Sequence, residues 1–282
     1  MTRRLGVVGY PLAHTLSPAI HKSALAQLGF EATYEACETA PPALGSLLAD
    51  LRRPEWLGLN VTLPYKQLVM PELDDLTAEA REIGAVNTIH HTAGRLRGAN
   101  MDARAFLADV EAAFGSLAGR RVAVLGAGGA ALAVCHALRR GPEVVWLWAR
   151  RAEQAAALAA HTGGAVRAAE LPRVARAEMV INCTSAGLHQ GESPVPAEAL
   201  PPGVLLYDLI YNPATTRLME AAQAQGGRAV NGLGMLVRQA ALALEMWTGR
   251  MPALEEMFAA AERELARRTS AEMPARAGAR QE

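Results

Sequence analysis

Four polar residues in the first 102 positions carry groups that could move a proton or hold a polar ligand. Lys66, Asn87 and Asp102 each follow a short apolar run, and Ser17 precedes a helical pattern. A positioned ammonium can donate a proton to an oxygen that gains negative charge, while carboxylate, amide and hydroxyl groups bind polar ligands. Each residue alone also has a structural explanation, since Lys66 can be a surface lysine, Asn87 a turn residue, and Asp102 or Ser17 a helix N-cap.

A glycine-rich turn offers a second kind of chemistry. Residues 122–131 read Val-Ala-Val-Leu-Gly-Ala-Gly-Gly-Ala-Ala, and a helical pattern follows. Gly126 permits a tight turn, Gly128 lets the backbone approach a pyrophosphate, and Ala131 is small enough for helix and strand to pack closely. The free amides of the helix N-terminus favour phosphate. The pattern predicts a dinucleotide site, although a plain strand-to-helix turn would also satisfy it.

Two arginines follow the next apolar run and bear on which dinucleotide binds. An enzyme that prefers NAD usually has an acidic residue here for the ribose 2′-hydroxyl, whereas Arg150 and Arg151 suit a 2′-phosphate. The alternative is that one or both are solvated residues at a helix start, with Glu153 weakening the preference. We favour NADP.

These groups need elements to position them, and the apolar pattern predicts an α/β fold with parallel sheets. Strands are expected at residues 5–9, 33–38 and 56–62. Helices are expected to begin at Ser17-Pro18 and to lie near residues 43–51 and 76–83. A second alternation then predicts five strands at residues 122–125, 144–148, 179–183, 205–209 and 229–230, which is typical of a doubly wound, Rossmann-like sheet. Helices are expected at 235–247 and 252–267.

The pattern therefore predicts two domains. We assign residues 1–101 to an α/β substrate-binding domain and 102–236 to a Rossmann dinucleotide domain. Helices within 237–268 are expected to pack back on the first domain. Residues 269–282 lack periodic apolar positions and are expected to form a flexible tail.

Composition excludes several classes of function. The 28 basic and 28 acidic residues give a net charge of +0, which argues against nucleic acid or an acidic membrane as a partner. No apolar run reaches the ~18–20 residues of a membrane span, and no signal-peptide core is visible, so a cytoplasmic protein is expected. Cys37, Cys135 and Cys183 are far apart, which predicts neither disulfides nor a metal site.

The motifs in their order resemble the shikimate dehydrogenase family, which also includes quinate and quinate/shikimate dehydrogenases. The likeness runs from about residue 5 to Gly249. It rests on segments 9–21, 60–66, 84–88, 100–102, 126–131, 182–187, 207–211 and 232–241.

The resemblance implies reversible NADPH-dependent reduction of 3-dehydroshikimate to shikimate in aromatic amino-acid biosynthesis, by a monomer or homodimer that needs no metal. It implies Lys66 and Asp102 as the catalytic pair, with Asp102 orienting the lysine. The substrate-binding residues it implies are Thr15, Ser17, Thr62, Lys66, Asn87, Asp102, Tyr211 and Gln239. The cofactor-binding residues it implies are Gly126, Ala127, Gly128, Gly129, Ala130, Arg150, Arg151, Leu209 and Gly232.

Three departures from the family pattern affect selectivity. The family commonly has Ser at the position of Thr15, and the extra methyl group could alter the choice between shikimate and quinate. Met101 replaces a threonine, and Ala149 and Arg151 replace the asparagine and threonine that usually flank the arginine matched by Arg150. Two rivals therefore stay open: a quinate or quinate/shikimate dehydrogenase that uses NAD, and a non-catalytic dinucleotide sensor, which would have no need of a proton-transfer lysine.

Histidine and tryptophan residues near these segments have structural interpretations. His14 and His21 are expected to be hydrogen-bonded structural histidines rather than catalytic ones. Trp146 and Trp148 alternate along a strand and are expected to pack against helices.

Overall fold

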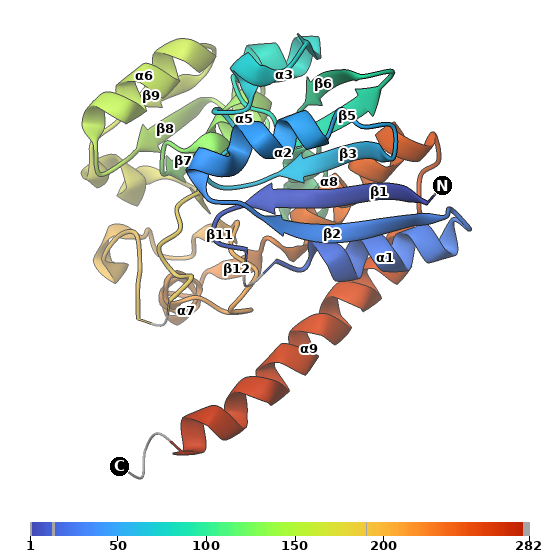
Figure 1. The fold of residues 1–282 in the computed structure, drawn as a ribbon. Coiled ribbons are helices and arrows are strands. Elements are labelled where there is room, and N and C mark those ends of the chain that lie inside the picture. The colour runs from blue at the N-terminus through green and yellow to red at the C-terminus, as the bar shows by residue number, and fades with distance from the viewer. Residues whose placement is uncertain (1, 13–14, 190, 279–282) are drawn as a thin grey trace.

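The computed structural model describes residues 2–12, 15–189 and 191–278, and it forms two α/β domains side by side (Figure 1). The first sheet has the strand order β2-β1-β3-β5-β6-β4. Its strands are β1 (Arg3–Gly9), β2 (Ala32–Glu38), β3 (Trp56–Val61), β4 (Asp75–Leu76), β5 (Thr88–Thr92) and β6 (Arg95–Ala99). The helices of this half are α1 (Ser17–Gln27), α2 (Leu44–Asp50) and α3 (Ala78–Ile83).

The first sheet is mixed, so the expectation of a purely parallel sheet is wrong here. Strand β1 pairs in parallel with β2 and β3, but β5 is antiparallel to both β3 and β6. Strands β5 and β6 are joined by Ala93 and Gly94, both with positive φ (49° and 78°). Such a turn forms an antiparallel hairpin, because a connection this short cannot contain the crossover that parallel strands require.

The second sheet is entirely parallel, as the alternating pattern predicts, with the order β12-β11-β10-β7-β8-β9. Its strands are β7 (Arg121–Leu125), β8 (Val144–Trp148), β9 (Val166–Ala168), β10 (Met179–Asn182), β11 (Leu205–Asp208) and β12 (Arg228–Asn231). Its helices are α4 (Asp102–Phe114), α5 (Gly129–Leu138), α6 (Ala152–Thr162) and α7 (Arg217–Ala224). The sequence pattern missed β9, because this strand has three residues and only Val166 is buried.

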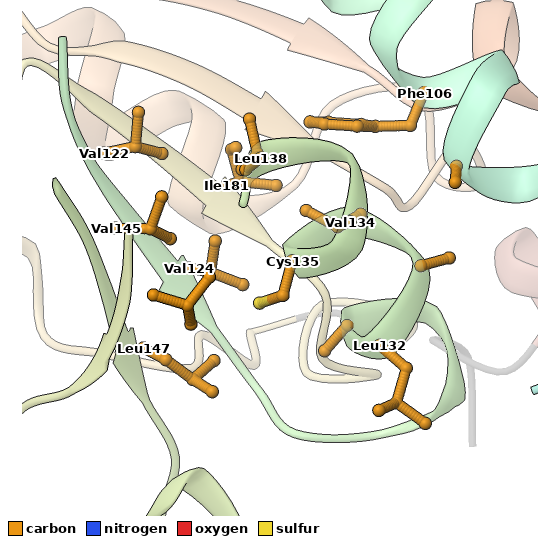
Figure 2. Packing of buried hydrophobic residues seen from close by; sticks show 14 of the residues in the cluster. Phe106, Val122, Val124, Leu132, Val134, Cys135, Leu138, Val145, Leu147 and Ile181 are labelled. Atoms are coloured by element: carbon orange, nitrogen blue, oxygen red, sulfur yellow. The ribbon is translucent and has the colours of Figure 1, made fainter. Parts of the chain in front are cut away.

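Close packing of α5 on the second sheet forms the core beneath the glycine-rich turn. Figure 2 shows Val134, Cys135 and Leu138 of α5 against Val124 of β7 and Ile181 of β10. Burial raises the pKa of the Cys135 thiol to about 12, which leaves it a small apolar group. The cysteines at 37, 135 and 183 are all free.

Two C-terminal helices, α8 (Leu233–Thr248) and α9 (Leu254–Gly278), pack on the first domain. Val237, Leu244 and Trp247 of α8 share a buried cluster with Leu5 and Ile20. The Trp247 indole donates a hydrogen bond to the Ile89 carbonyl at 3.0 Å. This return carries α8 from the second domain onto the first, where it contacts β3 and β5.

Two expectations about helix ends are wrong. Ser17 is the first residue of α1 rather than its N-cap, and the Thr15 hydroxyl accepts a 3.3 Å hydrogen bond from the Ser17 amide. The helix predicted to end at residue 267 continues through Gly278, because Ala, Arg and Glu favour helix even without an apolar stripe. Among the described helices, none is both long enough and apolar enough to cross a membrane.

Candidate active site

A chain of hydrogen bonds joins Lys66, Asp102, Asn87 and Gln239. The Lys66 ammonium lies 2.6 Å from Asp102 Oδ2, and Asn87 Nδ2 donates to Asp102 Oδ1 at 2.8 Å. The same amide lies 3.5 Å from Gln239 Oε1, although the two residues are 152 positions apart. The Lys66 and Asp102 side chains are only 14% and 5% exposed. The structure therefore unites four of the residues singled out in the sequence.

Each member of this group comes from a different element. Lys66 follows β3, Asn87 precedes β5, Asp102 is the first residue of α4, and Gln239 lies in α8. The structural alternative for Asp102 is wrong, since its carboxylate bonds to Lys66 and Asn87 while α4 has no side-chain cap. Three chain segments and the returning helix therefore define the position of the ammonium.

Backbone amides and neighbouring polar side chains hold Asn87 and Asp102 in place. Asn87 Oδ1 accepts hydrogen bonds from the Met101 amide at 2.8 Å and the Thr88 hydroxyl at 2.9 Å. Asn100 Oδ1 accepts the Asp102 amide at 2.9 Å. Because Met101 acts through its backbone N–H, the exchange of a threonine for methionine leaves this contact unchanged.

Asn60, to which the sequence assigned no role, contacts the backbone of Asn87 and so supports the Lys66–Asp102–Asn87 cluster. Its Oδ1 accepts the Tyr34 hydroxyl at 2.6 Å, and its Nδ2 lies 3.4 Å from the Asn87 carbonyl. Asn60 is 5% exposed in a strand whose every residue is buried. A polar residue inside such a strand was the signal available, because a buried amide needs partners.

A second group of hydroxyls lies at the start of α1. Ser17 is buried, and its hydrogen bond with the Tyr34 hydroxyl opposes the rise in the Tyr34 pKa that burial causes. Tyr211 packs against the same apolar cluster as Leu16. Burial raises the Tyr211 pKa, and the positive charge of Arg268 and a backbone hydrogen bond at Leu16 oppose that rise.

Tyr34 links the two groups, because its hydroxyl interacts with both Ser17 and Asn60. Thr62 is partly buried beside Gly9, at the end of β3. Among the described residues, Thr15, Thr62 and Tyr211 make no direct side-chain hydrogen bond with the Lys66 group.

The glycine-rich turn lies directly against Lys66. A Cβ on Gly129 would sit 3.1 Å from the Lys66 Cβ, so the two segments are in contact. Gly126 has φ +103°, a left-handed conformation that favours glycine. The space around Gly128 is open, and the first backbone bond of α5 runs from Leu132 N to Gly128 O. The amides of Gly129, Ala130 and Ala131 therefore have no acceptor within the helix.

The remaining predicted cofactor residues follow parallel strands of the second sheet. Arg150 and Arg151 are exposed between β8 and α6, and no ion pair within the described part of the chain engages them. Leu209 follows β11, and its carbonyl lies so close to Gly232 that a Cβ there would be 2.2 Å away. Both positions lie at the carboxyl edge of the sheet, where open α/β folds bind ligands.

His21 is a structural residue, as predicted. Its Nδ1 lies 2.9 Å from the Ser17 carbonyl, and its ring stacks on Tyr34 with centroids 4.0 Å apart. Burial lowers its pKa to about 4, so the ring is neutral at pH 7. Trp146 and Trp148 pack against a buried cluster that includes Leu125, Val180 and Leu206 of the same sheet. The expectation for His14 lies outside the described residues.

Comparison with known proteins identifies the family of this chain. Residues 7–89 match the family model described as the shikimate dehydrogenase substrate binding domain, and residues 232–262 match the shikimate 5′-dehydrogenase C-terminal domain. A shikimate dehydrogenase (NADP(+)) from Thermus thermophilus is 44% identical over 263 residues, covering 93% of this chain and 98% of the relative. The chain belongs to the shikimate dehydrogenase family.

Solved structures of this family share the fold. Shikimate 5-dehydrogenase from Thermus thermophilus, in complex with NADP(H) and shikimate, superposes with a TM-score of 0.87 at 44% identity, covering 93% of this chain and 99% of that one. Quinate dehydrogenase from Corynebacterium glutamicum, in complex with NAD, gives 0.83 at 29% identity, covering 92% and 98%. The fold is thus common to members with different substrates and cofactors.

Proposed function

We propose that this protein is an NADP-dependent shikimate dehydrogenase that interconverts 3-dehydroshikimate and shikimate. The observation that carries the proposal is the Lys66–Asp102 pair, held by Asn87 and in contact with the glycine-rich turn. Residues 1–101, with helices in 237–268, form the substrate-binding part of this proposal. Residues 102–236 form the cofactor-binding part.

In this proposal Lys66 is the proton donor and acceptor of the reaction. Reduction of a ring carbonyl leaves negative charge on its oxygen, and the ammonium can stabilise that charge and supply the proton. Asp102 orients the ammonium through the 2.6 Å contact and can accept a substrate hydroxyl. In the reverse direction Lys66 takes up the proton of the hydroxyl that is oxidised.

The other polar groups fit a polyhydroxylated carboxylic acid. Asn87 and Gln239 present amides beside Asp102, and Thr62 presents a hydroxyl at the end of β3. Thr15 and Ser17 lie at the N-terminus of α1, where their hydroxyls and the positive end of the helix dipole favour a carboxylate. Tyr211 adds a phenol near Leu16.

The second domain fits a dinucleotide. The open space at Gly128 and the free amides of α5 suit a pyrophosphate, and Ala127 and Ala130 are small neighbours in the same turn. NADPH, when bound, supplies the hydride. The exposed Arg150 and Arg151 would hold the 2′-phosphate, since guanidinium groups form paired hydrogen bonds with phosphate oxygens.

A matrix of initial rates tests the proposal. Shikimate and quinate are each oxidised with NADP and with NAD, and the four values of kcat/KM are compared. Shikimate with NADP is expected to give the highest value. A maximum for quinate with NAD would instead support a quinate dehydrogenase, and no turnover with any pair would support a dinucleotide sensor.

Assembly and location complete the proposal. We expect a monomer or a homodimer, which light scattering after size-exclusion chromatography distinguishes. The free cysteines at 37, 135 and 183 suit a reducing compartment such as the cytoplasm.

A further inference from the structure

Arg268 of α9 reaches the loop that precedes α1, far from it in sequence. Its Nη2 donates a 2.9 Å hydrogen bond to the Thr15 carbonyl, across 253 positions. Figure 1 shows α9 crossing beneath α1 and continuing beyond it, and the two helices pack together. The match to the C-terminal family domain ends at residue 262, before Arg268. The contact therefore comes from a part of α9 outside that match.

The guanidinium also acts on Tyr211, whose pKa its positive charge lowers against the effect of burial. Arg268 therefore acts on Thr15, one of the two residues that the proposed function assigns to the substrate carboxylate, and on the neighbouring Tyr211. Tyr211 packs against the same apolar cluster as Leu16, which places its side chain beside the same loop. The guanidinium of α9 thus lies between the loop before α1 and the segment that carries Tyr211.

The charge balance among Glu264, Arg267 and Arg268 is positive. Glu264 accepts hydrogen bonds at 2.8 Å from both arginines, and these contacts lower its pKa to about 2. One carboxylate against two guanidinium groups leaves one net positive charge on these three side chains. The Arg268 side chain is 23% exposed and Arg267 is 68% exposed, so solvent screens Arg267 more strongly.

We propose that Arg268 is a positioning residue for the substrate carboxylate. It holds the Thr15 carbonyl, which orients the Thr15 and Ser17 hydroxyls, and it brings positive charge to the carboxylate end of the substrate site. The inference rests on the proposed function, because it needs a substrate with a carboxylate at Thr15 and Ser17. The proposal also gives a function to the part of α9 after residue 262, which lies outside the matched family domain.

Steady-state kinetics with shikimate and NADP test this role in the full-length protein. Arg268→Gln is expected to raise the KM for shikimate about tenfold, with kcat and the KM for NADP changed less than about twofold, since a hydrogen bond with a charged partner contributes at this scale. Arg268→Lys keeps the charge and should recover most of the loss. Arg267→Gln is the matched control, because Arg267 shares Glu264 but makes no described contact with Thr15 or Tyr211, and it should leave the KM unchanged.

Two readouts separate this role from damage to the fold. KM does not depend on the fraction of enzyme that is folded, so partial unfolding lowers the measured kcat without producing the expected change. The KM of the unsubstituted enzyme should also rise with NaCl concentration, and Arg268→Gln should flatten that rise. An unchanged KM in Arg268→Gln, or an equal rise in Arg267→Gln, would overturn the inference while the proposed function stood. Absence of shikimate turnover in the unsubstituted protein would overturn both.

Discussion

Replacement of Lys66 is the most direct test of the chemistry. The chain has only two lysines, Lys22 and Lys66, and its other 26 basic residues are arginines, from a total of 28. Arginine does not release its proton at accessible pH, whereas lysine can. A lysine kept at position 66 among so many arginines agrees with a group that must give up and regain a proton.

Lys66→Ala is expected to lower kcat about 1000-fold, or ~4 kcal/mol of transition-state stabilisation, which lies within the usual range for a positioned acid or base. Shikimate affinity should fall only modestly, because Asn87, Gln239 and the α1 hydroxyls remain. Lys66→Arg keeps the positive charge and should still lose at least about 100-fold in kcat if proton transfer is the role.

Lys66→Ala should also lower the free energy of unfolding, because it removes the ion-pair partner of the buried Asp102 carboxylate. At 2.6 Å the gross attraction between Lys66 and Asp102 is about 6 kcal/mol at an effective dielectric constant of ~20, and the desolvation of two charges offsets most of it. Removing only the lysine leaves a carboxylate that is 5% exposed with Asn87 as its main partner, so we expect a loss of about 2–3 kcal/mol. Lys66→Ala combined with Asp102→Ala should recover part of that loss.

Stopped-flow or steady-state rates give kcat, calorimetric titration gives the shikimate affinity, and denaturant unfolding gives the stability. Lys22→Ala serves as the control, since Lys22 is exposed on α1. If Lys66→Ala retained kcat within tenfold of the unsubstituted enzyme, the assignment of Lys66 as the proton-transfer group would be wrong.

Three further predictions address the cofactor site and the core. Arg150→Ala should raise the KM for NADP by about 10- to 100-fold and that for NAD by less than about threefold, and parallel changes in both would refute 2′-phosphate recognition. His21 has a pKa of about 4 when folded and 6.5 when exposed, so its contribution to stability is complete above pH 6.5 and is lost as pH falls toward 4. The fall in unfolding free energy between pH 7 and 5 should be about 2 kcal/mol smaller in His21→Phe, and an equal fall would contradict the burial argument. Gly232→Ala should destabilise the protein by about 1–3 kcal/mol and weaken NADP binding, because its Cβ would meet the Leu209 carbonyl, and thermal unfolding with and without NADP measures both.

The cofactor domain was the easier half to predict from sequence. Its parallel strands are covered on both faces and read as continuous apolar runs, such as residues 122–125 and 144–148. The hairpin of β5 and β6 was missed, because His90, Arg95 and Arg97 interrupt any apolar run. A strand that is half exposed carries a weaker signal than a buried one.

The site itself could be predicted only in part. Asn87 and Asp102 are near in sequence, and both stood out as polar residues beside apolar runs. Their contact with Gln239 depends on α8 returning across 152 positions, which no local pattern specifies. The resemblance to a family supplied Gln239, and it could not supply Arg268, which lies beyond the matching motifs. Long-range contacts of this kind become visible only in the folded chain.

In the proposed reaction, helix α4 would couple proton transfer to the cofactor domain. Its first residue, Asp102, orients Lys66, while Phe106 and Val110 are buried in the core of the cofactor domain. Gly129 of the cofactor turn touches Lys66 from the other side. Because a packed helix moves as a rigid unit, any rotation between the domains must change the geometry of the Lys66–Asp102 pair or the contact at Gly129. In the proposed reaction, Lys66 would therefore be set for proton transfer only when both domains hold this arrangement, which would tie proton transfer to the position of the cofactor.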